Sequence, residues 1–220
     1  LRSLRLRAGA HLDAVYRAVK RPSPLQLCPS TVFFSQDAAM KGEGHPGLGG
    51  YMHGYAWSYR LESRHMCLPI AALEFVAVAC SFIIFHSLLV APEGEPAGAR
   101  MLVCESDALS AVMVLQNDSA KSPVMQTIHE LLEDLPEYQK VKDSVFFGHL
   151  YGPGNAMADP LSRGKTGVFA ELCKQLGITP TFLPFHADAL ALLDKVAETQ
   201  RHLLPVERAL GKRRRNCDLG

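Results

Sequence analysis

The sequence predicts an α/β fold in which a mixed sheet is flanked by helices. Three observations lead to this prediction. Short runs rich in β-branched and aromatic residues come early in the chain, one long apolar helical stretch follows them, and strand-like and helical runs then alternate. Read along the chain, the order is strand, strand, strand, helix, strand, helix, helix, strand, helix.

The composition is that of a globular protein. The chain has 220 residues, of which 48% are hydrophobic and 20% charged, so it can bury a domain core and carry appendages. Its 23 basic and 22 acidic residues give a net charge of +1, which excludes a strong electrostatic preference of the whole molecule for nucleic acid or membrane. Six cysteines without a CxxC pair predict a reduced, intracellular location, cytoplasmic or nuclear, and not secretion.

An amphipathic helix is expected at about residues 8–20, and the breaker run RPSPLQ follows it. The first strand is expected in STVFFSQD, which ends in Asp37. MKGEGHPGLGG predicts a hairpin turn rather than a phosphate-binding loop, because its glycines and proline suit a turn and no P-loop lysine is present. GYMHGYAWSYRLES predicts a second strand, and RHMCLP a short third. Trp57 and the neighbouring tyrosines are expected to pack rather than to stack on bases.

The stretch from 69 to 90 predicts a long apolar helix. It is long enough to raise the question of a membrane span, but Glu74 and His86 favour a buried helix with no membrane partner. The loop APEGEPAGA ends it. RMLVCESD then predicts a strand that ends near Asp107.

The remaining elements follow the same reasoning. Helices are expected at 108–116 and 122–135, a last strand in KVKDSVFFGHLYG, and a helical turn in NAMADPLSRG. FAELCKQLGI and ADALALLDKVAETQRHLL predict two further helices, separated by TPTFLPFH and followed by the basic run KRRR.

Four carboxylates are candidates for a metal site. Asp37, Asp107 and Asp159 lie at or beyond the ends of predicted strands, where catalytic groups of α/β sheets converge. Glu74 lies in the apolar helix without a charge partner nearby in sequence, so it should bind a cation or become protonated. Oxygen ligands favour Mg²⁺ over zinc. The residues alone leave an alternative open: in SQDAA and ESDAL, Asp37 and Asp107 could instead cap helices.

Four blocks of the sequence, in this order, resemble the ribonuclease H domain of retroelement polyproteins, especially beside the reverse transcriptases of tyrosine-recombinase retrotransposons. They are DAAMKGEGHPGLGGY, PIAALEFVAVACSFIIF, SDALSAVMVLQN and GHLYGPGNAMADPLSRG, and the resemblance covers about residues 30–165. The resemblance implies a five-stranded sheet of order 3-2-1-4-5. It also implies that residues 1–29 end an upstream polymerase or connection region of a longer polyprotein, and that 166–220 form a helical extension with a basic tail.

The resemblance further implies a function and its residues. The expected activity is hydrolysis of the RNA strand of RNA–DNA hybrids during reverse transcription, with two Mg²⁺ or Mn²⁺ ions and the neighbouring reverse-transcriptase domain as partner. The implied metal ligands and catalytic residues are Asp37, Glu74, Asp107 and Asp159. His149, ten positions before Asp159, is implied to help product release. Asn155 and Arg163 are expected to contact the substrate.

Two departures from the family pattern concern the same region. APEGEPAGA enlarges the loop between Glu74 and Asp107, and SDA replaces the more usual SDN at Asp107. Two other functions remain as alternatives. One is a catalytically silent ribonuclease H-like module that binds nucleic acid or a partner chain, and the other is an integrase-type nuclease on the same fold. The four acids and the HLYGPGN…AD ending favour ribonuclease H.

Overall fold

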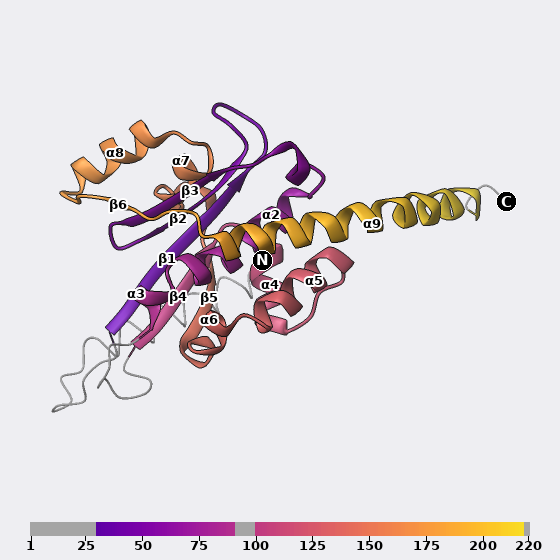
Figure 1. Cartoon of the computed structure of the whole chain (residues 1–220), viewed down its shortest axis with the longest axis horizontal. Helices are drawn as coiled ribbons and strands as arrows, with labels where there is room; N and C mark the ends of the chain where they lie inside the picture. The colour runs from indigo at the N-terminus through magenta and orange to yellow at the C-terminus, as the bar shows by residue number, and fades with distance from the viewer. Residues whose placement is uncertain (1–29, 91–99, 218–220) are drawn as a thin grey trace, which may run out of the picture.

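The computed structural model describes residues 30–90 and 100–217. Its strands form one six-stranded mixed sheet in the order β5-β4-β1-β2-β3-β6 (Figure 1). The strands are β1 (Ser30–Ala39), β2 (Gly47–Met52), β3 (Tyr55–Arg60), β4 (Arg100–Ser106), β5 (Val145–His149) and β6 (Thr181–Phe182).

The expected order of the first five strands is confirmed. Strands β1, β2 and β3 form an antiparallel meander, β4 is parallel to β1, and β5 is parallel to β4. Read from β3 to β5, this gives 3-2-1-4-5, as the resemblance implies. The short β6 is an addition, because it pairs in parallel with β3 at the edge of the sheet.

Two strand predictions were wrong. The segment GYMHGYAWSYRLES, expected as one strand, turns back at His53 and Gly54, which both have positive φ, so it supplies the end of β2 and all of β3. RHMCLP, expected as the third strand, begins within the short 3-10 helix η1 (Ser63–His65) and continues as turn. The number of strands before the apolar helix nevertheless stays at three.

Helices cover both faces of the sheet (Figure 1). On one face α2 packs against β1, and α5 and α9 pack on α2; on the other, α7 crosses β1 and β2 and contacts α8. The helices are α2 (Ile70–Ile84), α3 (His86–Leu89), α4 (Leu109–Asn117), α5 (Pro123–Glu133), α6 (Pro136–Gln139), α7 (Ala158–Ser162), α8 (Thr166–Gln175) and α9 (Ala187–Cys217). Two further 3-10 helices are η2 (Lys142–Ser144) and η3 (Gly152–Gly154).

Helix α2 is the centre of the core. Every residue from Ala72 to Ile83 is buried, as in a helix enclosed on all sides. Phe82 meets Phe34 of β1 edge-on, with ring centroids 5.4 Å apart, and contacts Tyr138 of α6 at 5.0 Å. The expected single helix from 69 to 90 breaks at Phe85, after which α3 forms a separate turn. Among the described residues, no helix combines the length and hydropathy that crossing a bilayer requires.

The segment after residue 165 is part of the same packed body. Phe169 and Cys173 of α8 pack beneath β3, and Leu193 and Val196 of α9 belong to the main core. The division of the chain into domains at residues 29 and 165 stays a prediction. The helix expected at 8–20, the run RPSPLQ and the loop at 91–99 lie outside the described residues. KRRR continues the backbone of α9, but its side chains are also outside the described part.

Candidate metal centre

Two aspartates lie side by side where parallel strands end. Strands β1 and β4 are parallel and pair Gln36 with Ser106, so the next residues, Asp37 and Asp107, lie next to each other. Asp37 is within β1, and Asp107 is the first residue after β4. This is the end of the sheet at which α/β proteins collect functional groups.

The third acid comes from the central helix. Glu74, in the second turn of α2, faces the end of β1, and its carboxylate accepts a hydrogen bond from the Ala38 backbone N–H. One carboxylate oxygen each of Asp37, Glu74 and Asp107 lies within 4.8 Å of the others, so that the three could hold one metal ion. We call these three residues the acid triad.

Burial makes the acid triad electrostatically costly in the absence of a cation. The pKa of Glu74 is raised to about 9, mainly by burial and then by the charges of Asp37 and Asp107. Burial also raises the pKa of Asp37 to about 6, although a hydrogen bond from Ser162 opposes this shift. The pKa of Asp107 is raised by burial too. Three neighbouring carboxyls that resist ionisation are a site at which a divalent cation would be stabilising.

The free oxygen atoms of the acid triad fit a hard cation. Glu74 Oε2 and Asp107 Oδ1 are buried and have no hydrogen-bond partner among the described residues. Such atoms are costly to bury unless something binds them. The acid triad borders an open cleft of about 830 Å³, which is also lined by Asp159 and Arg163. We call it the acid cleft. Carboxylate oxygens at an open cleft suit Mg²⁺ or Mn²⁺, which retain bound waters.

The fourth acid, Asp159, lies in the same cleft but not within the acid triad. It is the second residue of α7, a helix that lies against β1 and β2. The approach of α7 depends on Gly49, where a Cβ atom would lie 2.5 Å from the Ser162 nitrogen and 2.6 Å from Leu161 Cβ. Asp159 Oδ1 accepts a hydrogen bond of 2.8 Å from Arg163 Nε.

Arg163 therefore already has protein partners. Besides Asp159, it donates from Nη1 to the carbonyl oxygen of Lys41, at 3.0 Å. Its expected contact with substrate stays a prediction.

Asn155 holds α7 in place. Its side chain is 1% exposed, and Nδ2 donates to the Gln36 carbonyl oxygen at 3.0 Å, one residue before Asp37. Its backbone carbonyl accepts the N–H of Asp159 at 3.1 Å. Asn155 thus links the backbone at Asp37 to the backbone at Asp159, and its predicted contact with substrate is untested by this arrangement.

His149 lies at the end of β5 beside the acid triad. Its Nε2 is 3.0 Å from the carbonyl oxygen of Asp107. Because a carbonyl oxygen can only accept, Nε2 carries a proton in this contact. The ring also meets Tyr151 edge-on, with centroids 5.4 Å apart. His149 itself is exposed.

The helix-capping alternative is not supported. Asp37 lies inside a strand, so it begins no helix. Helix α4 has Ala108 as its N-cap residue and shows no side-chain cap, although Asp107 directly precedes it. The two aspartates are instead directed into the cleft.

Ser162 is a site residue that the sequence analysis did not identify. Its hydroxyl donates to Asp37 Oδ2 and also lies 2.9 Å from the Asp159 carbonyl oxygen. Its only sequence signal is its place three residues after Asp159, which puts it on the same side of a short helix. The partner of Ser162 is 125 residues away in the chain, so local pattern could not reveal it.

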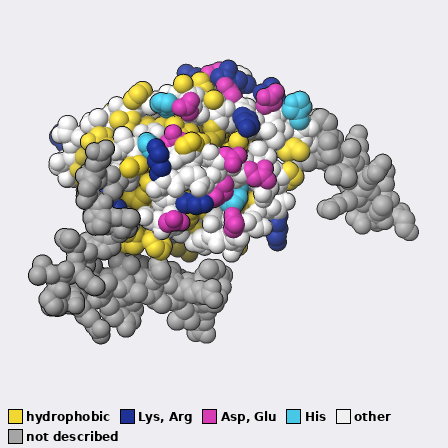
Figure 2. Space-filling view, turned by 60° about the horizontal axis from the view of Figure 1, so that its bottom comes forward, with side chains coloured by type: hydrophobic (Ala, Val, Ile, Leu, Met, Phe, Trp, Pro, Cys, Tyr) yellow, Lys and Arg dark blue, Asp and Glu magenta, His cyan; other side chains and the backbone are white. Residues whose placement is uncertain are grey.

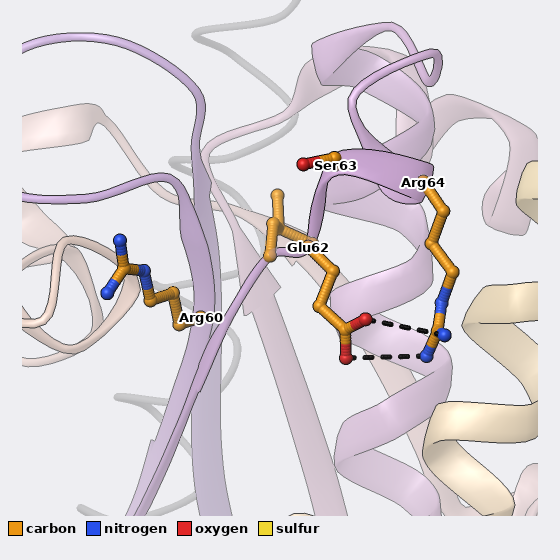
Figure 3. Close-up of a pocket in the computed structure, with 5 residues that line it drawn as sticks. Arg60, Glu62, Ser63 and Arg64 are labelled. Atoms are coloured by element: carbon orange, nitrogen blue, oxygen red, sulfur yellow. Dashed lines mark hydrogen bonds and ion pairs between the residues drawn. The ribbon is translucent and has the colours of Figure 1, made fainter.

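A second cleft, of about 480 Å³, is lined by residues 60–64 and shares none of its lining with the acid cleft. Figure 3 shows Glu62 paired with Arg64, and Arg60 directed away from this pair. Arg64 and the buried His65 also bind Asp194 of α9, at 2.7 and 2.8 Å. These contacts fasten α9 to the turn before α2.

The molecular face in Figure 2 carries acidic side chains interspersed with lysine, arginine and histidine. This mixture agrees with the near-neutral net charge of the chain. Any attraction for nucleic acid on that face would therefore come from individual cations near the site rather than from a continuous basic field.

Comparisons with known proteins give one structural likeness to report. No family model matches the sequence, and no curated protein matches it either. Among solved structures, the chain is similar to ribonuclease H1 from the halophilic archaeon Halobacterium salinarum, with 12% sequence identity and a TM-score of 0.42. The match covers 60% of this chain and 94% of the archaeal one. A likeness of this extent leaves the function to be judged from the site's own chemistry.

Proposed function

We propose that the chain is a metal-dependent nuclease of the ribonuclease H type, which hydrolyses the RNA strand of RNA–DNA hybrids. The observation that carries the proposal is the acid triad: three buried carboxylates from β1, α2 and the end of β4, within 4.8 Å of one another at an open cleft. The four sequence blocks supply the substrate class. They also supply the retroelement setting, in which the chain acts beside a reverse transcriptase in the cytoplasm or nucleus.

The proposed ligands have distinct supports. Asp37 is oriented by the Ser162 hydroxyl and Glu74 by the Ala38 backbone N–H, whereas at Asp107 it is the backbone carbonyl that His149 contacts. Asp159 would complete a second ion position from α7. Bound divalent ions would activate a water molecule and neutralise charge at the phosphate.

The reaction is the addition of water across a phosphodiester bond. The water oxygen bonds to phosphorus, the bond from phosphorus to the 3′ oxygen breaks, and a proton reaches that leaving oxygen, which gives a 5′-phosphate and a 3′-hydroxyl. We expect His149 to assist product release, and the contact of its Nε2 with the Asp107 carbonyl oxygen, next to the acid triad, supports this role. A hybrid would be recognised by its shape, its phosphates and its 2′-hydroxyls rather than by base sequence.

The test is cleavage of labelled duplexes by the purified chain. Wild type with Mg²⁺ or Mn²⁺ should cut the RNA strand of an RNA–DNA hybrid and leave double-stranded DNA intact. Asp107→Asn should reduce the rate at least about 100-fold, the size expected when a preorganised charged group is lost from a catalytic site. The matched control is Asp143→Asn, which changes an exposed aspartate of η2 and should leave the rate unchanged.

Two outcomes would contradict the proposal. Equal cutting by Asp107→Asn would remove Asp107 from the mechanism. Tight binding of hybrid without cutting, in the presence of either metal, would favour a catalytically silent module. Thermal unfolding with and without Mn²⁺ separates loss of metal binding from loss of folding.

A further inference from the structure

Asp159 and Arg163 form the contact from which a further role can be inferred. The exposed fractions of their side chains are 46% and 28%, and both side chains line the acid cleft. Asp159 is the one acid of the predicted set that has a cationic partner and also the one that lies outside the acid triad. The acid that is paired with the Arg163 guanidinium is thus the same acid that lies apart from the other three.

Arg163 is held from several directions. Its Nε binds Asp159, its Nη1 binds the Lys41 carbonyl, and its own carbonyl oxygen accepts the N–H of His45 at 3.2 Å. Lys41 and His45 flank the turn between β1 and β2. The turn reaches Arg163 because Gly42 and Gly44 adopt positive φ of 108° and 105°, a conformation that favours glycine. Arg163 therefore joins α7 to the turn that follows Asp37.

The charge of Arg163 reaches the acid triad as well. Its field lowers the pKa of Asp37, although burial of that carboxyl has the larger and opposite effect. A guanidinium stays charged at all ordinary pH values, so it cannot leave by losing a proton. A metal ion that needs Asp159 must instead compete with this fixed cation for Oδ1.

We propose that Arg163 is a positioning residue that neutralises Asp159 until a second metal ion arrives, and thereby weakens the second ion-binding step relative to the first. The inference rests on the proposed function, because it assumes that the acid triad holds the first ion. Movement of the Arg163 side chain away from Asp159 accompanies the second step. The movement breaks the ion pair with Asp159 and no covalent bond.

The test is a stepwise Mn²⁺ titration of the whole chain without nucleic acid, in which free Mn²⁺ is followed by electron paramagnetic resonance. Arg163→Gln should tighten the second step about two- to fivefold, the range expected for a half-exposed ion pair. The first step should stay closer to wild type. Lys165→Gln is the matched control, because it removes a positive charge two positions away that pairs with Glu43 instead.

A double-mutant cycle separates a specific contact from a general loss of charge. Asp159→Asn should itself weaken or abolish the second step, and adding Arg163→Gln in that background should neither tighten nor restore it, because the carboxylate that Arg163 competes for is gone. Tightening of equal size in that background would show a general field effect and overturn the inference. Arg163→Lys keeps the charge and should stay near wild type; a value equal to that of Arg163→Gln would likewise overturn it.

The remaining outcomes distinguish this inference from the proposed function. If wild type binds Mn²⁺ but Arg163→Gln leaves the second step unchanged or weaker, the inference fails and the metal site stands. If wild type binds no Mn²⁺, the metal site itself fails, and the inference with it. Thermal unfolding of each metal-free variant verifies that it is folded. If Arg163→Gln is not folded, Arg163→Met, which also removes the charge, provides the test.

Discussion

At the residue scale, Glu74 is where burial and charge conflict most directly. Its side chain is 9% exposed, it belongs to the most apolar helix of the chain, and its nearest ionisable neighbours are two further acids. Evolutionary replacement by glutamine or leucine would remove the conflict at once. The presence of a carboxyl at this position therefore makes sense through what it binds rather than through stability.

The conflict predicts how stability depends on pH. The folded-state pKa values of about 9 for Glu74 and about 6 for Asp37 lie above their ordinary values. Between about pH 4 and about pH 9 the native state thus binds more protons than the unfolded state, so the free energy of unfolding falls as pH rises. Glu74→Gln should flatten this slope and be more stable than wild type near pH 8 without divalent ions.

The measurement is urea unfolding in the presence of a chelator at several pH values. Repetition with Mg²⁺ should restore wild-type stability most strongly at the alkaline end, because ion binding there displaces fewer protons. A Glu74→Gln protein with the wild-type slope would show that this carboxyl is not the source of the pH dependence.

The sequence predicts these single residues unevenly. Asp37 and Asp107 can be found because each closes an apolar strand-like run, and Glu74 because it interrupts an apolar helix. The Asp159–Arg163 pair is spaced by four residues within a helical turn, yet Arg163 was expected at the substrate instead. Its second partner, the Lys41 carbonyl, is 122 residues away, and only the folded chain brings the two together.

At the scale of elements, helix α7 shows how the sheet shapes the cleft. It has only five residues, and it is placed by the glycine-bearing strand β2 beneath it and by Asn155 before it. A short helix cannot hold its own conformation in water, so these tertiary contacts decide its position. Both Asp159 and Ser162 depend on that position.

Adding a single methyl group at Gly49 of β2 should therefore disturb the acid cleft, because it displaces α7. Gly49→Ala would push α7 away from β2, and overpacking of this kind costs about 1–3 kcal/mol or more. We expect a lower unfolding temperature together with weaker Mn²⁺ binding. Gly167→Ala in α8 is the control, because its added Cβ meets nothing within 4 Å, and alanine there should be neutral or stabilising by up to about 1 kcal/mol.

The elements also show where periodicity misleads. The order of strands and helices was largely predictable because glycine or proline separates most of the apolar runs. The turn between β2 and β3 was missed because tyrosines and Trp57 continue the strand-like pattern through it, while His53 and Gly54 take the positive φ that reverses the chain. In the glycine-rich run after Asp37, the expected turn is present, but its last glycines belong to β2.

At the scale of the whole molecule, the segment after residue 165 is bound into the fold. Helix α9 crosses α2 and α5, and Asp194 joins it to Arg64 and His65 (Figure 1). The sequence predicted the helices of this segment from their apolar spacing. It could not predict their packing, because nothing in the pattern states which apolar face they meet.

Removing one buried side chain of α9 tests this attachment. Leu193 is 0% exposed, and Leu193→Ala should lower the free energy of unfolding by about 2–5 kcal/mol. Leu176, which follows α8 and is 63% exposed, gives a control of the same chemistry that should change it by no more than about 0.5 kcal/mol. Equal small effects in urea unfolding would mean that α9 is a detachable appendage.

The two-residue strand β6 has a consequence for how these molecules behave at high concentration. The N–H groups of Thr181 and Leu183 donate to the carbonyl oxygens of Gly54 and Ala56, so backbone groups of β3 that would face outward are already taken. Open margins of sheets are where separate polypeptides join into aggregates. The late segment of the chain thus covers the first part of this margin, at Tyr55 and Ala56, and leaves a shorter stretch of β3 to which a strand of a neighbouring copy could add.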